Sequence, residues 1–158
     1  MGNSITAGLV TIGGLINRHR KKIKKAAEKA ENWVRPVLAK ISSPFDTRIH
    51  PITKKEIFHN GIDLPVPVGT NIKSPMNGIV ESIYFNDAGG NQVIVKHDNG
   101  YKTGYSHLFK ALVKKGDKAK RGDLIALSGN TGKSTGPHLH FTLTNPLGAK
   151  VDPAKVIF

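Results

Sequence analysis

The sequence contains no cysteine, no long apolar run and few acidic residues. Without cysteine the protein can form neither a disulfide nor a thiolate metal site, so any metal must be held by nitrogen and oxygen ligands. Nowhere do 18 apolar residues follow one another, so no ordinary membrane-spanning helix is encoded. With 24 basic and 11 acidic residues among 158, the formal charge of +13 predicts a polyanionic partner: nucleic acid, an anionic lipid surface, or the teichoic acids and carboxylates of a bacterial wall. The length fits one domain with an appendage.

The basic charge is concentrated near the N-terminus. Residues 17–40 hold nine basic and two acidic side chains. Hydrophobic residues of 23–37 recur at the spacing of one helix face, with charged residues opposite. We therefore predict a basic amphipathic helix over 17–35, ended or kinked by Pro36. The Ser-Ser-Pro sequence of 42–44 is interpreted as a linker.

An apolar stretch from Ile5 to Ile16, interrupted by three glycines, precedes this helix. A secretory signal places positive charge before its apolar run and a small-residue cleavage site after it, whereas here the charge follows the run. We therefore expect no recognisable signal peptide. The arm of residues 1–43 has two interpretations: it binds an anionic membrane surface, or it docks on a partner protein or on its own domain.

Short apolar runs separated by glycine-rich turns follow this arm. Asp98-Asn99-Gly100 indicates a hairpin, because asparagine and glycine tolerate the positive φ angles of tight turns. We predict a mainly β domain with an antiparallel β-sheet over 44–158, with little room for helix beyond 111–114, behind the helical arm. The expected strands are 79–85, 92–97, 101–107, 124–127 and 139–143.

Gly132-Lys133-Ser134 looks like the end of a phosphate-binding loop. That motif requires a glycine at position 127 and a helix afterwards, but this chain has Leu127 and then Thr135-Gly136-Pro137. We therefore reject nucleotide binding at this segment.

One expected strand carries two histidines. His138 and His140 are two residues apart, so the alternation of a strand directs both imidazoles to one face. Leu139, Phe141 and Leu143 point to the other face and supply a buried side that fixes the strand. The two imidazoles are therefore expected on a rigid element. Two exposed strand histidines are the alternative interpretation of the pair by itself.

Two further segments supply metal-binding residue types. His59 and Asp63 offer an imidazole and a carboxylate, both of which bind zinc. Asn60-Gly61 predicts a turn between them, and this turn must bring the two ligands together. A turn-capping carboxylate is the alternative interpretation of Asp63. His107, at the end of the third expected strand, is a third candidate.

Three separated motifs retain these residues, and in their order and spacing they resemble the lysostaphin-type zinc metallopeptidases, which cut peptide cross-links in bacterial peptidoglycan. The resemblance covers about residues 44–158 and leaves the arm outside. Thr142 stands where the family often has glutamate, at a position that is not a ligand. The three motifs are His59-x-x-x-Asp63, Tyr105-Ser106-His107-Leu108 and Gly136-Pro137-His138-Leu139-His140-Phe141, supported by Arg48-Ile49-His50-Pro51, Gly61-Ile62-Asp63-Leu64, Gly122-Asp123-Leu124-Ile125 and Ser128-Gly129-Asn130-Thr131-Gly132.

The resemblance implies that His59, Asp63 and His140 bind zinc (Zn2+) and that His107 and His138 are unliganded catalytic histidines. Three protein ligands leave a fourth position open for water or a substrate carbonyl, as in catalytic zinc sites. Zinc lowers the pKa of bound water to about 7 and polarises the scissile carbonyl. The free imidazoles suit proton acceptance from that water and assistance to the oxyanion or the leaving amine. Which of the two performs which task stays open.

The leading hypothesis is a zinc endopeptidase that hydrolyses peptidoglycan cross-links outside the cytoplasm. Because that substrate lies outside while the N-terminus lacks a secretory signal, we expect delivery by a phage particle or on lysis. The arm would then attach the enzyme to a virion protein or an anionic membrane surface. The alternative is a non-catalytic peptidoglycan-binding or structural virion module, against which the five retained site residues argue. We expect no specific nucleic-acid binding, because neither aromatic interleaving nor a nucleic-acid motif accompanies the basic arm.

The remaining histidines and Arg48 receive other interpretations. We expect His19 to be solvated, and His50 and His97 to shape the groove or its edge. Arg48 either contacts a substrate carboxylate or forms an ordinary structural ion pair.

Overall fold

The structure is a computed structural model that describes residues 13–21, 32–50 and 52–158. The chain divides into two compact units, residues 1–32 and 33–158, and each is described by itself.

The described part of the first unit consists of a helix at residues 13–21 and of Asn32. The helix starts before Asn17, the residue at which the sequence predicted its start. Its side chains from Leu15 onward are exposed, including that of His19, as expected. Residues 22–31, which hold much of the predicted apolar face, lie outside the described residues. Within the described part of the chain, no helix is long and apolar enough to cross a membrane.

The end of the predicted helix, residues 33–35, is not helical and belongs to the second unit. Trp33 is buried, with its ring edge-on to His97 at a centroid distance of 5.1 Å and to Tyr101 at 5.7 Å. The helical spacing was therefore misleading here, because Trp33 packs into the core of the β unit. The division between the units accordingly falls after Asn32 and not after residue 43.

Strands make up most of the second unit. Over 111–114, where the sequence left room for a helix, the chain forms the end of a strand and a bend. The bounds in chain order are β1 (Asp46–Ile49), β2 (Glu56–His59), β3 (Ile62–Pro65), β4 (Asn71–Lys73), β5 (Gly78–Asn86), β6 (Gly90–His97), β7 (Lys102–Leu108), β8 (Lys110–Ala111), β9 (Lys118–Ala119), β10 (Leu124–Leu127), β11 (His138–Thr144), β12 (Lys150–Val151) and the 3-10 helix η1 (Pro153–Lys155).

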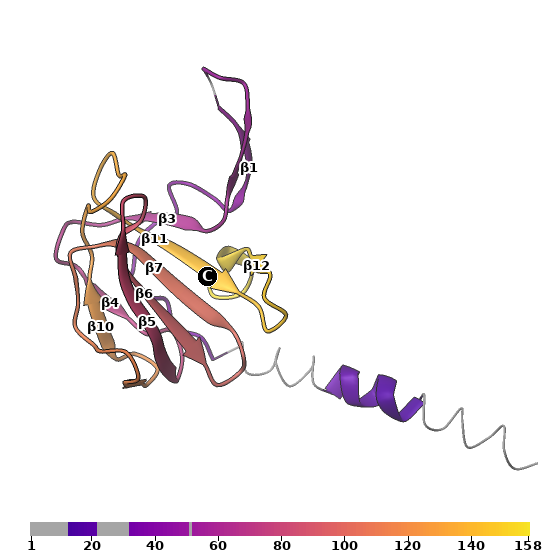
Figure 1. Ribbon diagram of the computed structural model, residues 1–158. Coiled ribbons are helices and arrows are strands. Elements are labelled where there is room, and N and C mark those ends of the chain that lie inside the picture. Colours follow the sequence, from indigo (N-terminus) through magenta and orange to yellow (C-terminus); the bar gives the residue numbers. More distant parts are fainter. Residues whose placement is uncertain (1–12, 22–31, 51) are drawn as a thin grey trace, which may run out of the picture. The chain divides into compact units, whose positions relative to one another are not determined.

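The strands pair antiparallel throughout these elements, as predicted, and the five expected strands are present as β5, β6, β7, β10 and β11. The largest sheet has the order β12-β11-β7-β6-β5-β9, with β3 also paired to β11 (Figure 1). β4, β10 and β8 form a second sheet, and β1 and β2 form a separate hairpin. Gly100, in the turn between β6 and β7, has a φ of +88°, which explains the glycine at this position.

The core lies against one face of β11. Leu139, Phe141 and Leu143 are fully buried, as the alternation predicted, and β4 and β10 add fully buried isoleucines from the second sheet. The other face of β11 stays open, and it carries His138 and His140. The packing of the apolar face therefore fixes the strand that presents the two imidazoles.

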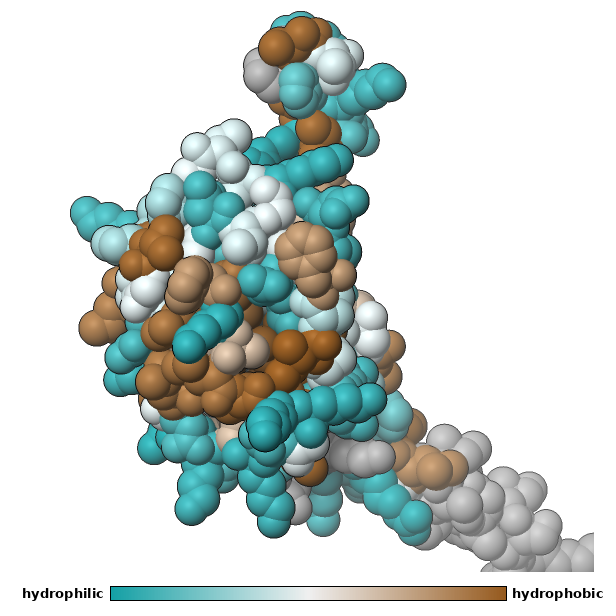
Figure 2. Space-filling model, turned by 60° about the vertical axis from the view of Figure 1, so that its left-hand side comes forward, coloured by the Kyte–Doolittle hydropathy of each residue, from teal (hydrophilic) through white to brown (hydrophobic). Residues whose placement is uncertain are grey.

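Some apolar side chains remain at the surface of the second unit. Figure 2 shows a group of them on the side that lies at the left in Figure 1, where β5 and the sheet of β4, β10 and β8 are found. Exposed apolar residues of β5 and of the segments beside β8 include Ile83, Phe85, Phe109 and Leu112, which are between 39% and 62% exposed. None of these four lines the groove at the histidines.

Candidate metal centre and active site

Three strands bring two imidazoles and a carboxylate together at the open face. β3 pairs with β11 so that Asp63 lies directly opposite His140, and His59 is the last residue of β2. Oδ1 of Asp63 lies 2.9 Å from Nδ1 of His140 and 3.2 Å from Nε2 of His59, and the two nitrogens are 3.2 Å apart. A tetrahedral zinc ion with ligand distances of about 2.0–2.2 Å separates its ligands by about 3.3–3.6 Å. The sides of the triangle are slightly shorter than these separations, so the triangle is close to the size of a zinc site.

The outer nitrogens of both ligand imidazoles already have partners. Nδ1 of His59 donates to the carbonyl of Pro44 at 2.8 Å, and Nε2 of His140 donates to Oδ1 of Asn60 at 3.0 Å. With these protons on the outside, the inner nitrogens carry lone pairs, and they converge with a carboxylate oxygen. Three acceptors so close together repel one another unless a cation lies between them, and outer hydrogen bonds of this kind are typical of metal-binding histidines. The donor set therefore fits zinc.

Asp63 is held in its ionised form. Burial raises the pKa of its carboxyl, but the neighbouring imidazoles of His140, His59 and His138 outweigh burial, so the pKa lies below its usual range. Its backbone is fixed as well, because its amide donates to the carbonyl of Ser43 and its carbonyl accepts from the amide of Ser42, both at 3.0 Å. Residues 42–44, interpreted from the sequence as a linker, thus support two of the three ligands.

His107 and His138 lie beside this triangle as a second pair of imidazoles, with ring centroids 4.7 Å apart. Nε2 of His138 is 3.7 Å from Oδ1 of Asp63. Nδ1 of His107 donates to the carbonyl of Thr131 at 2.7 Å, and Nδ1 of His138 donates to the carbonyl of Gly136 at 2.7 Å. Both rings therefore keep Nε2 free of a proton. The structure brings all five predicted site residues together.

His107 reaches the open face through an unusual backbone conformation. It has a φ of +61°, one of only two such non-glycine residues among those described. Its amide donates to the carbonyl of Gly89 at 2.7 Å, which holds the strained conformation in place. Burial is the main cause that lowers the pKa of His107, and the neighbouring imidazoles of His138 and His140 lower it further, so its own imidazole is neutral at neutral pH.

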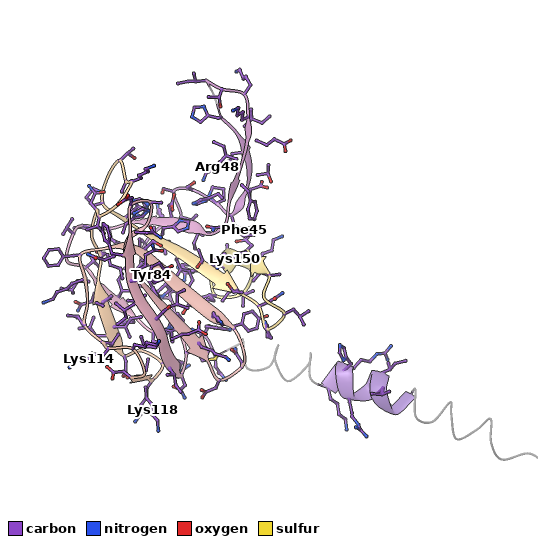
Figure 3. The ribbon with its side chains drawn as sticks, in the orientation of Figure 1. Phe45, Arg48, Tyr84, Lys114, Lys118 and Lys150 are labelled. Atoms are coloured by element: carbon purple, nitrogen blue, oxygen red, sulfur yellow. The ribbon has the colours of Figure 1, made fainter. Side chains whose placement is uncertain are left out.

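A groove of about 770 Å³ surrounds the five residues. Arg48 from β1, Tyr84 from β5 and Lys150 from β12 line it, and Figure 3 shows the strands from which each side chain comes. Within the described residues Arg48 forms no ion pair, so the structural alternative for this residue is not supported. On the floor, the hydroxyls of Tyr84 and Ser106 both donate to Oε1 of Gln92, at 3.2 and 3.0 Å.

Sequence reasoning missed several supporting residues. Asn60 was considered only as part of a turn, although its position next to His59 was a signal. Ser134, in the rejected phosphate-loop segment, lies with its hydroxyl 3.1 Å from Nδ1 of His138, and no helix follows it.

Two other histidines were expected to shape the groove or its edge. Nδ1 of His50 accepts hydrogen bonds from two backbone amides of the hairpin turn. His97 is buried in the core, so its predicted place at the groove was wrong.

A mainly antiparallel β domain with two imidazoles and one carboxylate around an open position has the features of a catalytic metal site. Residues 57–153 match peptidase family M23. The peptidoglycan DD-endopeptidase ShyA of Vibrio cholerae is 43% identical over 145 residues, which cover 90% of this chain and 33% of ShyA. The chain thus spans about a third of that relative.

Solved structures are similar as well. A zinc-containing peptidase from Vibrio cholerae is 40% identical, with a TM-score of 0.73 over 77% of this chain and 39% of that one. The catalytic domain of lysostaphin from Staphylococcus simulans is 30% identical, with a TM-score of 0.65 over 82% of this chain and 95% of that one. The chain belongs to peptidase family M23, the lysostaphin-type zinc metallopeptidases.

Proposed function

We propose that this chain is a zinc-dependent endopeptidase that hydrolyses the peptide cross-links of bacterial peptidoglycan outside the cytoplasm. The observation that carries the proposal is the convergence of His59, Asp63 and His140 with the free Nε2 atoms of His107 and His138 at the floor of one open groove. The matching endopeptidase from Vibrio cholerae supports this substrate class.

We assign His59, Asp63 and His140 as the ligands of zinc, which when bound polarises a water molecule and the scissile carbonyl. The division follows from the hydrogen bonds, because only these three residues direct their free atoms at one another within 3.2 Å. The ionised state of Asp63 suits this role, since metal ligands must be deprotonated.

His107 and His138 are assigned to proton transfer. A neutral imidazole with a free Nε2 accepts the proton of the attacking water, and once protonated it donates to the oxyanion or to the leaving amine. The carbonyls of Thr131 and Gly136 keep Nδ1 protonated, so each ring presents the nitrogen that this chemistry needs. Both residues line the groove.

The test is digestion of defined muropeptide dimers by the zinc-loaded protein, with the products identified by mass spectrometry. We expect two peptides joined by a cross-link to be released as separate stems, and chelation of zinc to stop the reaction. Binding without any product would instead support a non-catalytic peptidoglycan-binding or structural virion module.

We further propose that residues 1–32 attach the peptidase to its site of action, either on a virion protein or on an anionic membrane surface. The described helix of this unit exposes Leu15 and Ile16 together with Arg18, Arg20 and Lys21, which suits either surface. Removal of residues 1–32 should abolish attachment and leave cleavage of small muropeptides nearly unchanged. Salt-sensitive attachment to vesicles would indicate the anionic surface, and salt-insensitive attachment to phage particles would indicate the protein. Attachment retained after the removal would contradict the proposal.

A further inference from the structure

The groove at the histidines continues along the open face of the large sheet. Ile94, Gly104, Thr142 and Lys150 line both this groove and a second hollow of about 540 Å³. Gly104 lies on the floor between them. Because it has no side chain, Oγ1 of Thr142 can lie close to it, whereas a Cβ at this position would be only 2.4 Å from that atom. The two hollows therefore form one path over β7 and β11.

Three lysines lie in register at the far end of this path. Lys102 of β7 and Lys150 of β12 both pair with Thr144 of β11, and Lys96 of β6 pairs with Lys102. Residues paired across antiparallel strands direct their side chains to the same face. Lys96, Lys102 and Lys150, which we call the basic row, thus cross four neighbouring strands with Thr144 among them.

The charge of the basic row is only partly neutralised. Glu81 forms an ion pair with Lys102 at 2.8 Å. In the described part of the chain, Lys96 and Lys150 form no ion pair, and Nζ of Lys150 donates to the hydroxyl of Thr144 at 2.9 Å. Burial and the nearby charge of Lys102 lower the pKa of Lys150, so the protein itself supplies too little negative charge at this place.

Such an arrangement costs stability. Like charges directly opposite each other destabilise a strand pair, and Lys96 and Lys102 occupy such positions. An unfavourable pair of like charges that the rest of the fold does not compensate is expected at a position where the protein binds a ligand. An anion placed over the row would relieve the repulsion and accept hydrogen bonds from the lysines.

We propose that the basic row is a subsite for a carboxylate of the peptide that is cut at the histidines. His140 and Thr144 are four residues apart on β11, as Ser106 and Lys102 are on β7, which places the row about 13 Å from the metal site along the strands. An extended peptide covers this distance with about four residues. The proposal rests on the proposed function and adds to it that the substrate carries a free carboxylate about four residues from the cleaved bond.

The test compares two forms of one muropeptide, with free carboxyl groups and with the same groups as carboxamides. We expect the wild-type protein to cleave the free form with a kcat/KM about fivefold higher, the effect of about one exposed ion pair. In the double variant Lys96→Gln, Lys150→Gln the ratio should fall to about one. Lys102 is left in place, because its replacement would leave Glu81 without its ion-pair partner.

The double variant Lys114→Gln, Lys118→Gln is the matched control. Both are exposed lysines, one in the segment after β8 and one in β9, that lie well away from Lys150 in Figure 3, and their replacement removes the same two charges. We expect the wild-type ratio to persist in this variant. If Lys114→Gln, Lys118→Gln lowers the ratio as much as Lys96→Gln, Lys150→Gln, overall charge and not the basic row is responsible, and the proposal is overturned.

A binding measurement separates this proposal from the proposed function. Calorimetry with the His138→Ala variant, which we expect not to cleave, should show the free form binding about fivefold more tightly than the carboxamide form. If no muropeptide is cut by the wild type but this difference is present and is lost on Lys150→Gln, the subsite stands and the endopeptidase function fails. Equal cleavage and equal binding of the two forms would overturn the subsite and leave the function intact.

Discussion

Asn60 should tune the metal site although it is not itself a ligand. Its Oδ1 accepts the proton of Nε2 of His140 at 3.0 Å, and Asn60→Ala removes this acceptor, so Nδ1 is no longer held unprotonated toward Asp63. Partners of this kind contribute about 10- to 100-fold to metal affinity. Because Asn60 is exposed and water can replace it, we expect the lower end, about tenfold, or about 1.4 kcal/mol.

The assay is competition for zinc between the protein and a chromophoric chelator. Asn60→Asp is the matched control, since it keeps an acceptor oxygen in the same place and adds a charge that strengthens the hydrogen bond. Zinc affinity should therefore fall in Asn60→Ala and stay equal or rise in Asn60→Asp. Equal affinity in all three proteins would refute the argument from the outer hydrogen bond, and an equal loss in both variants would assign the effect to packing.

Other predictions concern the remaining histidines and Asp63. Asp63→Ala and His140→Ala should each lose zinc and activity, and full zinc occupancy by elemental analysis would contradict the ligand assignment. His107→Ala and His138→Ala should retain zinc and lose about 10²-fold or more of hydrolysis; a folded variant without metal would show that the residue is a ligand. Burial lowers the pKa of His97 from 6.5 to about 4. The unfolded chain thus binds a proton that the folded one does not, so stability is full above pH 6.5 and falls toward pH 4 by up to about 3 kcal/mol. Urea unfolding should show this slope flattened in His97→Gln, and an unchanged slope would exclude His97 as its source.

The local part of the site was predictable from one strand. The alternation of β11 placed His138 and His140 on one face because Leu139, Phe141 and Leu143 had to be buried on the other, and the burial confirms it. This inference needs only the geometry of a strand and an apolar face. It required no knowledge of the partners across the sheet.

The long-range part was not predictable from spacing. That Asp63 lies opposite His140 depends on the pairing of β3 with β11, whose residues are far apart in the chain. The resemblance of the motifs supplied this association, and the local sequence supplied none. The orientation of His107 toward the open face was not predictable either. A positive φ at a non-glycine residue has no signal in the sequence, because only the surrounding structure stabilises it.

The start of the second unit was misread, because residues 33–35 were interpreted as the end of a helix and residues 42–44 as a linker, while both segments contribute to the structure of this unit. Trp33 is buried against His97, and the carbonyls of Ser43 and Pro44 hold the amide of Asp63 and Nδ1 of His59. Composition describes side chains and does not reveal such backbone hydrogen bonds. Removal of residues 1–43 would therefore disturb the core, through Trp33, and the backbone contacts of the ligand Asp63, so lost activity would report on folding. Removal of residues 1–32 leaves these contacts in place, and only that truncation separates attachment from catalysis.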